Sequence, residues 1–73
     1  MEAYVLIQTE AGRRPIAHRL RAIPGVMAAE DLTGAFDAIA RARTGSGGRP
    51  VEEIVGEIAR LPGVTRALPA PLT

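Results

Sequence analysis

Two stretches of the chain decide its fold, because they repeat each other. Residues 16–26 read IAHRLRAIPGV and align without a gap on residues 54–64, which read IVGEIARLPGV. In both copies the apolar residues recur at the spacing of a helix with one buried face. Both copies then reach a proline, which cannot continue a helical hydrogen-bond ladder, and a glycine, which turns the chain back. The repeat therefore predicts two helices, each followed by a turn and a strand.

A strand candidate precedes each predicted helix. Residues 3–9 read AYVLIQT and residues 35–42 read AFDAIARA, both rich in residues that favour strands. Proline is favoured at the first position of a helix, where its missing N–H is not needed. We therefore expect Pro15 and Pro50 to be the first residues of the two helices.

The remaining strands follow from turn residues. The pair Thr33-Gly34 predicts a hairpin turn between a strand that starts at Val26 and the strand of residues 35–42. After the second helix we expect a short last strand over residues 64–68. Two prolines, Pro69 and Pro71, cannot donate hydrogen bonds to a sheet beyond that point.

This order, strand-helix-strand twice, predicts an α+β fold in one domain covering residues 1–73. Its usual solution is the ferredoxin-like βαββαβ sandwich, a four-stranded antiparallel sheet with two helices on one face. The first strand is apolar on both sides, however, with Tyr4 and Leu6 on one and Val5 and Ile7 on the other. Alternation leaves open which side faces the helices. We expect a second copy of the chain to cover the other side.

Composition excludes several classes of function. The chain has 73 residues, nine arginines, no lysine and a formal net charge of +1, which is too balanced for a general polyanion binder. It has no cysteine, so disulfides and thiolate metal sites are excluded. We expect neither a signal peptide nor a membrane span, and we expect a cytoplasmic location.

Candidate catalytic groups are few, and each has a plainer interpretation. His18 is predicted to point to solvent on the first helix, and one histidine makes no metal or cofactor site. Glu30 and Asp31 are adjacent in a strand, so they face opposite sides and indicate a solvated strand edge. The glycine-rich residues 44–49 predict a flexible loop and lack the lysine of a phosphate-binding loop. We expect no catalytic residue, no metal, no cofactor and no enzyme activity.

Nucleic acid is not an expected direct partner. Arginine pairs at Arg13-Arg14 and at Arg41 and Arg43 could contact phosphates, yet binding to a sheet surface also needs aromatic platforms. The chain has only two aromatic side chains that could serve as such platforms, Tyr4 and Phe36.

One short segment has the chemistry of a ligand site. Residues 32–38 read LTGAFDA. The glycine lets backbone amides approach an anion, so amides around Gly34 would hold an α-carboxylate. Asp37, three residues later, would accept an α-ammonium group. On composition alone an ordinary turn is the favoured alternative, because turns use glycine and aspartate routinely.

Taken together, these pieces resemble the effector domain of the Lrp/AsnC feast/famine transcription regulators, often called RAM. The resemblance is carried by the strand of residues 3–9, the IPGV of residues 23–26, the TGAFDAIA of residues 33–40 and the LPGV of residues 61–64. It spans nearly the whole chain, and the combination is more specific than any single piece.

The resemblance implies a module that dimerises through its sheet and assembles into rings, commonly octamers or decamers. It also implies an amino-acid effector bound between dimers near the Gly-x-x-Asp loop, with Thr33, Gly34, Ala35 and Asp37 as the ligand-binding residues. Because the first strand begins near Met1, the chain is expected to be a stand-alone form without a helix-turn-helix. Full-length Lrp/AsnC regulators are then possible partners in transcription.

Two alternatives stay open at this point. The first is a small dimeric enzyme of the monooxygenase or lactone-isomerase type, which uses the same sandwich but needs an acid or base between helices and sheet. The sequence offers no buried histidine or tyrosine pair there. The second is a chain that only assembles, and so competes with related regulators for places in a ring.

Overall fold

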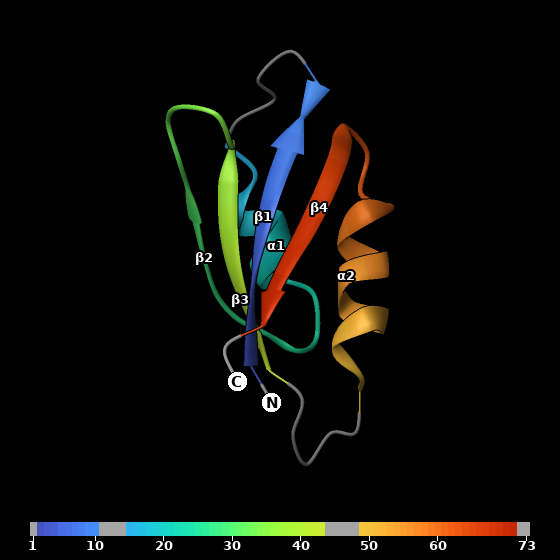
Figure 1. Cartoon of the computed structure of the whole chain (residues 1–73). Helices are drawn as coiled ribbons and strands as arrows, with labels where there is room; N and C mark the ends of the chain where they lie inside the picture. The colour runs from blue at the N-terminus through green and yellow to red at the C-terminus, as the bar shows by residue number, and fades with distance from the viewer. Residues whose placement is uncertain (1, 11–14, 44–48, 72–73) are drawn as a thin grey trace.

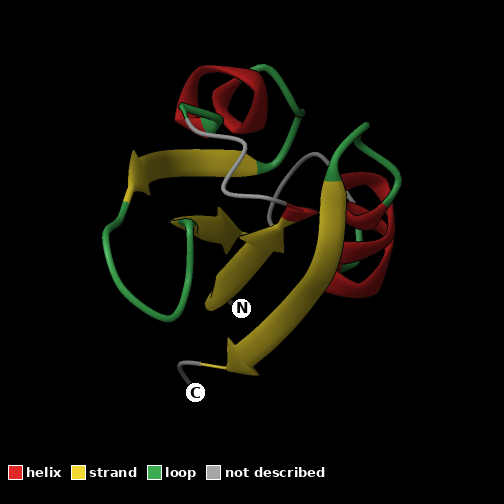
Figure 2. Cartoon of the chain, turned by 90° about the horizontal axis from the view of Figure 1, so that it is seen from above, coloured by secondary structure: helices red, strands yellow, loops and turns green. Residues whose placement is uncertain are grey.

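The computed structural model describes residues 2–10, 15–43 and 49–71. Along the chain, the elements are β1 (Glu2–Thr9), α1 (Ala17–Arg21), β2 (Val26–Asp31), β3 (Ala38–Arg43), α2 (Val51–Ala59) and β4 (Val64–Pro71) (Figure 1). The four strands form one sheet in the order β2-β3-β1-β4. Every neighbouring pair is antiparallel, and both helices lie on the same side of the curved sheet (Figure 2). The predicted ferredoxin-like fold is confirmed.

Burial along β1 settles which side of the sheet faces the helices. Ala3, Val5, Ile7 and Thr9 are buried, whereas Tyr4 is exposed. On β3 the buried residues are all alanine, which leaves room for the helices to approach the sheet closely. Branched side chains from the helices fill the space above them, namely Ile16, Leu20, Ile54 and Ile58.

The two predicted proline-glycine turns are confirmed. Gly25 has a φ of 100° and Gly63 a φ of 91°, a region that residues with a Cβ rarely adopt. At Gly25 space is limiting as well. A Cβ there would lie 2.4 Å from Cδ1 of Ile54, which is fully buried in α2. This turn is therefore packed directly against the core.

The expected helix starts at the two prolines are wrong by one or two residues. The residue before α2 is Pro50 itself, with extended backbone, and its carbonyl accepts hydrogen bonds from the N–H groups of Glu53 and Ile54. The residue before α1 is Ile16, so Pro15 lies one position further out. In both places proline supplies a fixed approach to the helix and stays outside it.

The predicted bounds of two strands also need correction. β3 begins at Ala38, so residues 35–37 belong to the loop before it. β4 continues to Pro71, past the predicted end at residue 68. Pro69 and Pro71 are two residues apart, so their nitrogens face the same side of the strand. β4 is an edge strand, whose unpaired side tolerates a missing N–H.

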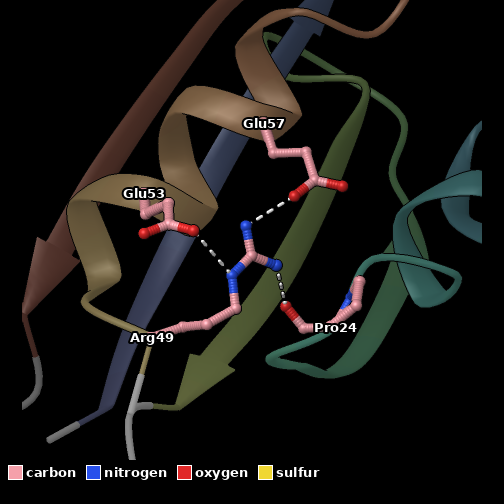
Figure 3. Close-up of polar contacts among 4 residues, drawn as sticks. All are labelled: Pro24, Arg49, Glu53 and Glu57. Carbon is pink, nitrogen blue, oxygen red and sulfur yellow. Dashed lines mark hydrogen bonds and ion pairs between the residues drawn. The ribbon is translucent and has the colours of Figure 1, made fainter. Parts of the chain in front are cut away.

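Arg49 ties the two halves of the chain together (Figure 3). Its guanidinium donates to the carbonyl oxygen of Pro24 at 2.8 Å, to Glu53 at 3.2 Å and to Glu57 at 2.5 Å. The hydrogen bond to Glu57 raises the pKa of Arg49 above its ordinary value, so the group stays charged. The sequence placed Arg49 at the end of a flexible loop. The other residues of that loop, 44–48, lie outside the described residues.

No helix in the described parts of the chain has the length and apolar character needed to cross a membrane.

Candidate functional site

The loop between β2 and β3, residues 32–37, contains all the predicted ligand-binding residues. It lies at the end of the sheet where β1 also ends (Figure 1). Thr33, Gly34 and Ala35 are exposed, and Asp37 is half-buried. Gly34 has a φ of 117°, and apart from its chain neighbours no atom of the described residues lies within 4 Å of the place where its Cβ would be. The loop therefore has a backbone conformation that favours glycine, with open space beside it.

The backbone amides of this loop point to anion binding. The N–H of Leu32 donates to the carbonyl of Asp37 at 2.9 Å, and the N–H of Asp37 donates to the carbonyl of Ile7 at 2.8 Å. Between these two anchors, the N–H groups of residues 33–36 donate to no other residue in the described ranges. A short run of unoccupied amides around a glycine with positive φ suits a carboxylate or another anion.

The carboxylate of Asp37 anchors the loop to the end of β1. Its Oδ2 accepts hydrogen bonds from the backbone N–H of Thr9 at 2.7 Å and from the Thr9 hydroxyl at 2.9 Å. Thr9 is only 8% exposed. The β1–β4 register shifts at this point, between Gln8 and Thr9. This contact gives Asp37 a structural role that sequence analysis missed. Its role toward a ligand stays a prediction.

Gln8 makes a second link between β1 and the loop. Its side-chain Nε2 donates to the carbonyl of Ala35 at 2.8 Å. The alternation of β1 places Gln8 on the same side of the sheet as Tyr4 and Leu6, opposite the helices. No local sequence signal pairs Gln8 with Ala35, because the contact joins residues 27 apart in the chain.

Asp31, the last residue of β2, caps α1. Its Oδ1 accepts hydrogen bonds from the N–H groups of Ile16 at 2.7 Å and Ala17 at 3.1 Å. The prediction that Asp31 merely solvates a strand edge is therefore wrong. The sequence did hold a signal for this role. Ile16, the residue before α1, has no side-chain acceptor, so the first N–H groups of the helix need an acceptor from another part of the chain.

The sheet face away from the helices is apolar in its centre. Across it, Leu6 pairs with Ile39 of β3 and with Leu68 of β4, while Tyr4 pairs with Ala70. We call these five residues the central patch. Tyr4 remains 38% exposed. The charged and polar residues of the same face surround it: Glu2, Gln8, Glu30, Arg41, Arg43 and Arg66. Arg43 forms an ion pair with Glu2 at 3.4 Å.

A shallow hollow lies beside the central patch. It measures about 180 Å³ and opens between Tyr4, Glu30, Ile39 and Arg41 over small alanines. The open face is therefore an apolar surface with a depression and a charged rim, features that protein interfaces share.

The described residues show no metal-binding group of histidine, cysteine and carboxylate side chains. His18 is exposed on α1, as predicted.

Comparisons with known proteins agree with this description. The Lrp/AsnC ligand binding domain matches residues 2–68. The crystal structure of FFRP-DM1 superposes with a TM-score of 0.73 at 23% identity, covering 93% of this chain and 92% of that one. A hypothetical protein, PHS023 from Pyrococcus horikoshii, gives a TM-score of 0.72 at 26% identity, covering 99% of this chain and 90% of that one. No curated protein matches.

Proposed function

This chain belongs to the Lrp/AsnC ligand binding domain family, and on that premise we propose that it is a regulatory module for a small amino-acid effector. The effector binds at the β2–β3 loop, and the module works as a self-assembled oligomer. The observation that carries the proposal is the run of amides at residues 33–36 that bond no other described residue, beside a glycine with open space next to it.

The loop suits both charged groups of an amino acid. The α-carboxylate accepts hydrogen bonds from the amides around Gly34, with Thr33 and Ala35 as flanking contacts. The α-ammonium lies toward Asp37, whose negative charge attracts it. The two Thr9 hydrogen bonds to Oδ2 hold this carboxylate in place and so pre-organise the site.

Self-assembly is supported by the open sheet face. Its central patch is apolar and its rim is charged, as in stable interfaces. Both sheet edges are poorly suited to pairing. The β4 edge carries Pro69 and Pro71, and the β2 edge has a register shift near Val26 and a carbonyl, that of Ala29, bonded by Arg21. We therefore place the second copy on the open face, with further association into rings such as octamers or decamers.

A role in transcription would then pass through a partner. A domain that senses an effector acts on DNA by joining a regulator with a DNA-binding segment. Full-length Lrp/AsnC regulators are the proposed partners, because this chain belongs to their ligand binding domain family. No observation favours the enzyme alternative, since Thr9 is the one polar residue found in the described core.

Calorimetry with the twenty standard amino acids tests the effector site. We expect at least one to bind the wild-type protein and to raise its melting temperature. Asp37→Asn keeps an oxygen for Thr9 and removes the charge, so it should fold and lose the binding. Glu30→Ala, which removes a carboxylate outside the loop, is the matched control and should bind normally.

Two results would refute the proposal. One is the absence of binding by every amino acid, and the other is unchanged binding in Asp37→Asn.

A further inference from the structure

Gln8 is the one residue in the described ranges that belongs to both proposed surfaces. Its side chain lies at the rim of the open sheet face, in register with Arg66 of β4. The same side chain reaches across to the loop and donates to the carbonyl of Ala35 at 2.8 Å. Its backbone carbonyl also accepts a hydrogen bond from the Thr65 hydroxyl at 3.2 Å, which adds a link between β1 and β4 at this position.

From this placement we infer that Gln8 couples self-association through the open face to the conformation of the effector loop. The inference rests on the proposed function and names the regulation of its site. Gln8 is a positioning residue: it holds the loop backbone, and it affects the effector only through that backbone.

The coupling has a simple physical cause. The hydrogen bond between Gln8 and Ala35 is exposed in the single chain, so water competes for both partners. When a second copy covers the open face, water leaves the rim and the bond strengthens. The loop is then held in one conformation. An effector binding to an already ordered loop loses less entropy.

The same coupling works in reverse. An effector that orders the loop fixes Ala35 and so fixes the rotamer of Gln8 before the second copy arrives. Linkage requires the two effects to be equal in size. Because one neutral hydrogen bond carries the coupling, we expect a factor of about 2 to 10 in either equilibrium.

Gln8→Glu is the sharpest variant. It keeps the shape of the side chain, but a carboxylate cannot donate to the Ala35 carbonyl. Arg66→Ala is the matched control, because it alters the rim at the same height without a contact to the loop. Gln8→Ala serves as a second variant in case the new charge disturbs the rim.

The experiment measures amide hydrogen exchange by NMR for Leu32 and Asp37, whose N–H groups are hydrogen-bonded at the two ends of the loop. It is done without effector, at protein concentrations on both sides of the association midpoint found by ultracentrifugation. In the wild type and in Arg66→Ala, we expect exchange to slow about 2- to 10-fold on association. In Gln8→Glu and Gln8→Ala, association should persist while loop exchange no longer responds to it.

The inference is overturned by a loop that responds to association equally in the Gln8 variants, by a wild-type loop that does not respond, or by a wild-type chain that stays single. Failure of the amino-acid screen is a separate result. It would refute the proposed effector while a concentration-dependent loop would still establish the coupling.

Discussion

The turn at Gly25 and the loop at Gly34 both depend on a glycine with positive φ, but their surroundings differ. Gly25 is packed against Ile54. Two hydrogen bonds also hold this turn: the side chain of Arg49 donates to the carbonyl of Pro24, and the backbone N–H of Arg43 donates to the carbonyl of Gly25. At Gly34, no atom of the described residues other than its chain neighbours lies within 4 Å of the place of a Cβ. The first glycine is needed because the interior leaves no room. The second has open space beside it among the described residues.

This difference separates structural from functional use of the same residue type. A glycine in contact with the core has a structural role, and the sequence indicates it by a proline next to the glycine at the end of a helix. A glycine beside unoccupied amides offers its backbone to another molecule. The four sets of variants below test how far that distinction holds. All are compared at one protein concentration, since association would add to stability.

Gly25→Ala should have the largest effect. It adds backbone strain of about 1–2 kcal/mol and overpacking of about 1–3 kcal/mol against Ile54, a loss of about 2–5 kcal/mol in the free energy of unfolding. Gly34→Ala carries the strain alone and should lose about 1–2 kcal/mol. Urea denaturation measures both. Equal losses would contradict the distinction between the packed turn and the open loop.

Asp31→Ala should come next, at about 1–2 kcal/mol, because it leaves two amides at the start of α1 without their acceptor. The neighbouring Glu30→Ala should change stability by less than about 0.5 kcal/mol. Thermal or urea denaturation of the pair provides the check. If the two variants are equally stable, Asp31 does not cap α1 in solution.

Thr9→Val should lose about 1 kcal/mol, since it removes one hydroxyl that donates to Asp37 and keeps the volume of the side chain. The backbone N–H of Thr9 still bonds the same carboxylate. Amide exchange should speed up at Asp37, whose N–H bonds the carbonyl of Ile7, and stay unchanged at Val26 in the Gly25 turn. Faster exchange at Val26 instead would mean that the two regions are not independent.

Arg49→Ala should have the smallest effect on stability. The ion pairs that it removes are partly exposed, and the turn that it holds is also fixed by Ile54 and by the Arg43 amide. The difference from wild type should shrink further in high salt. A loss as large as that of Gly25→Ala would show that Arg49, and not packing, holds this turn.

The sequence allowed the helices, both proline-glycine turns and the ferredoxin-like topology to be predicted, because each rests on short-range signals. The start of β3 and the role of Asp31 were missed, since both depend on residues far away in the chain. Asp37 was predicted to lie in the strand, but it precedes β3. Its backbone N–H bonds Ile7 of β1, and its carboxylate bonds Thr9 of β1. The extension of β4 to Pro71 also follows from its edge position, which only the assembled sheet defines.

The candidate site divides in the same way. Gly34 and its exposed neighbours were predicted from the local pattern, and the structure places them together on one loop. Gln8 was missed because its bond to Ala35 forms only when β1 and the loop come together. The alternation of residues in β1 shows on which side of the sheet Gln8 lies, but it does not show which residue Gln8 bonds.

The most direct test of the central claim is an NMR titration of labelled protein with each standard amino acid, comparing the N–H signals of Gly34 and Gly25. The account requires at least one amino acid to shift the Gly34 signal to saturation while the Gly25 signal stays in place. If no amino acid moves Gly34 more than Gly25, the open loop is not an effector site.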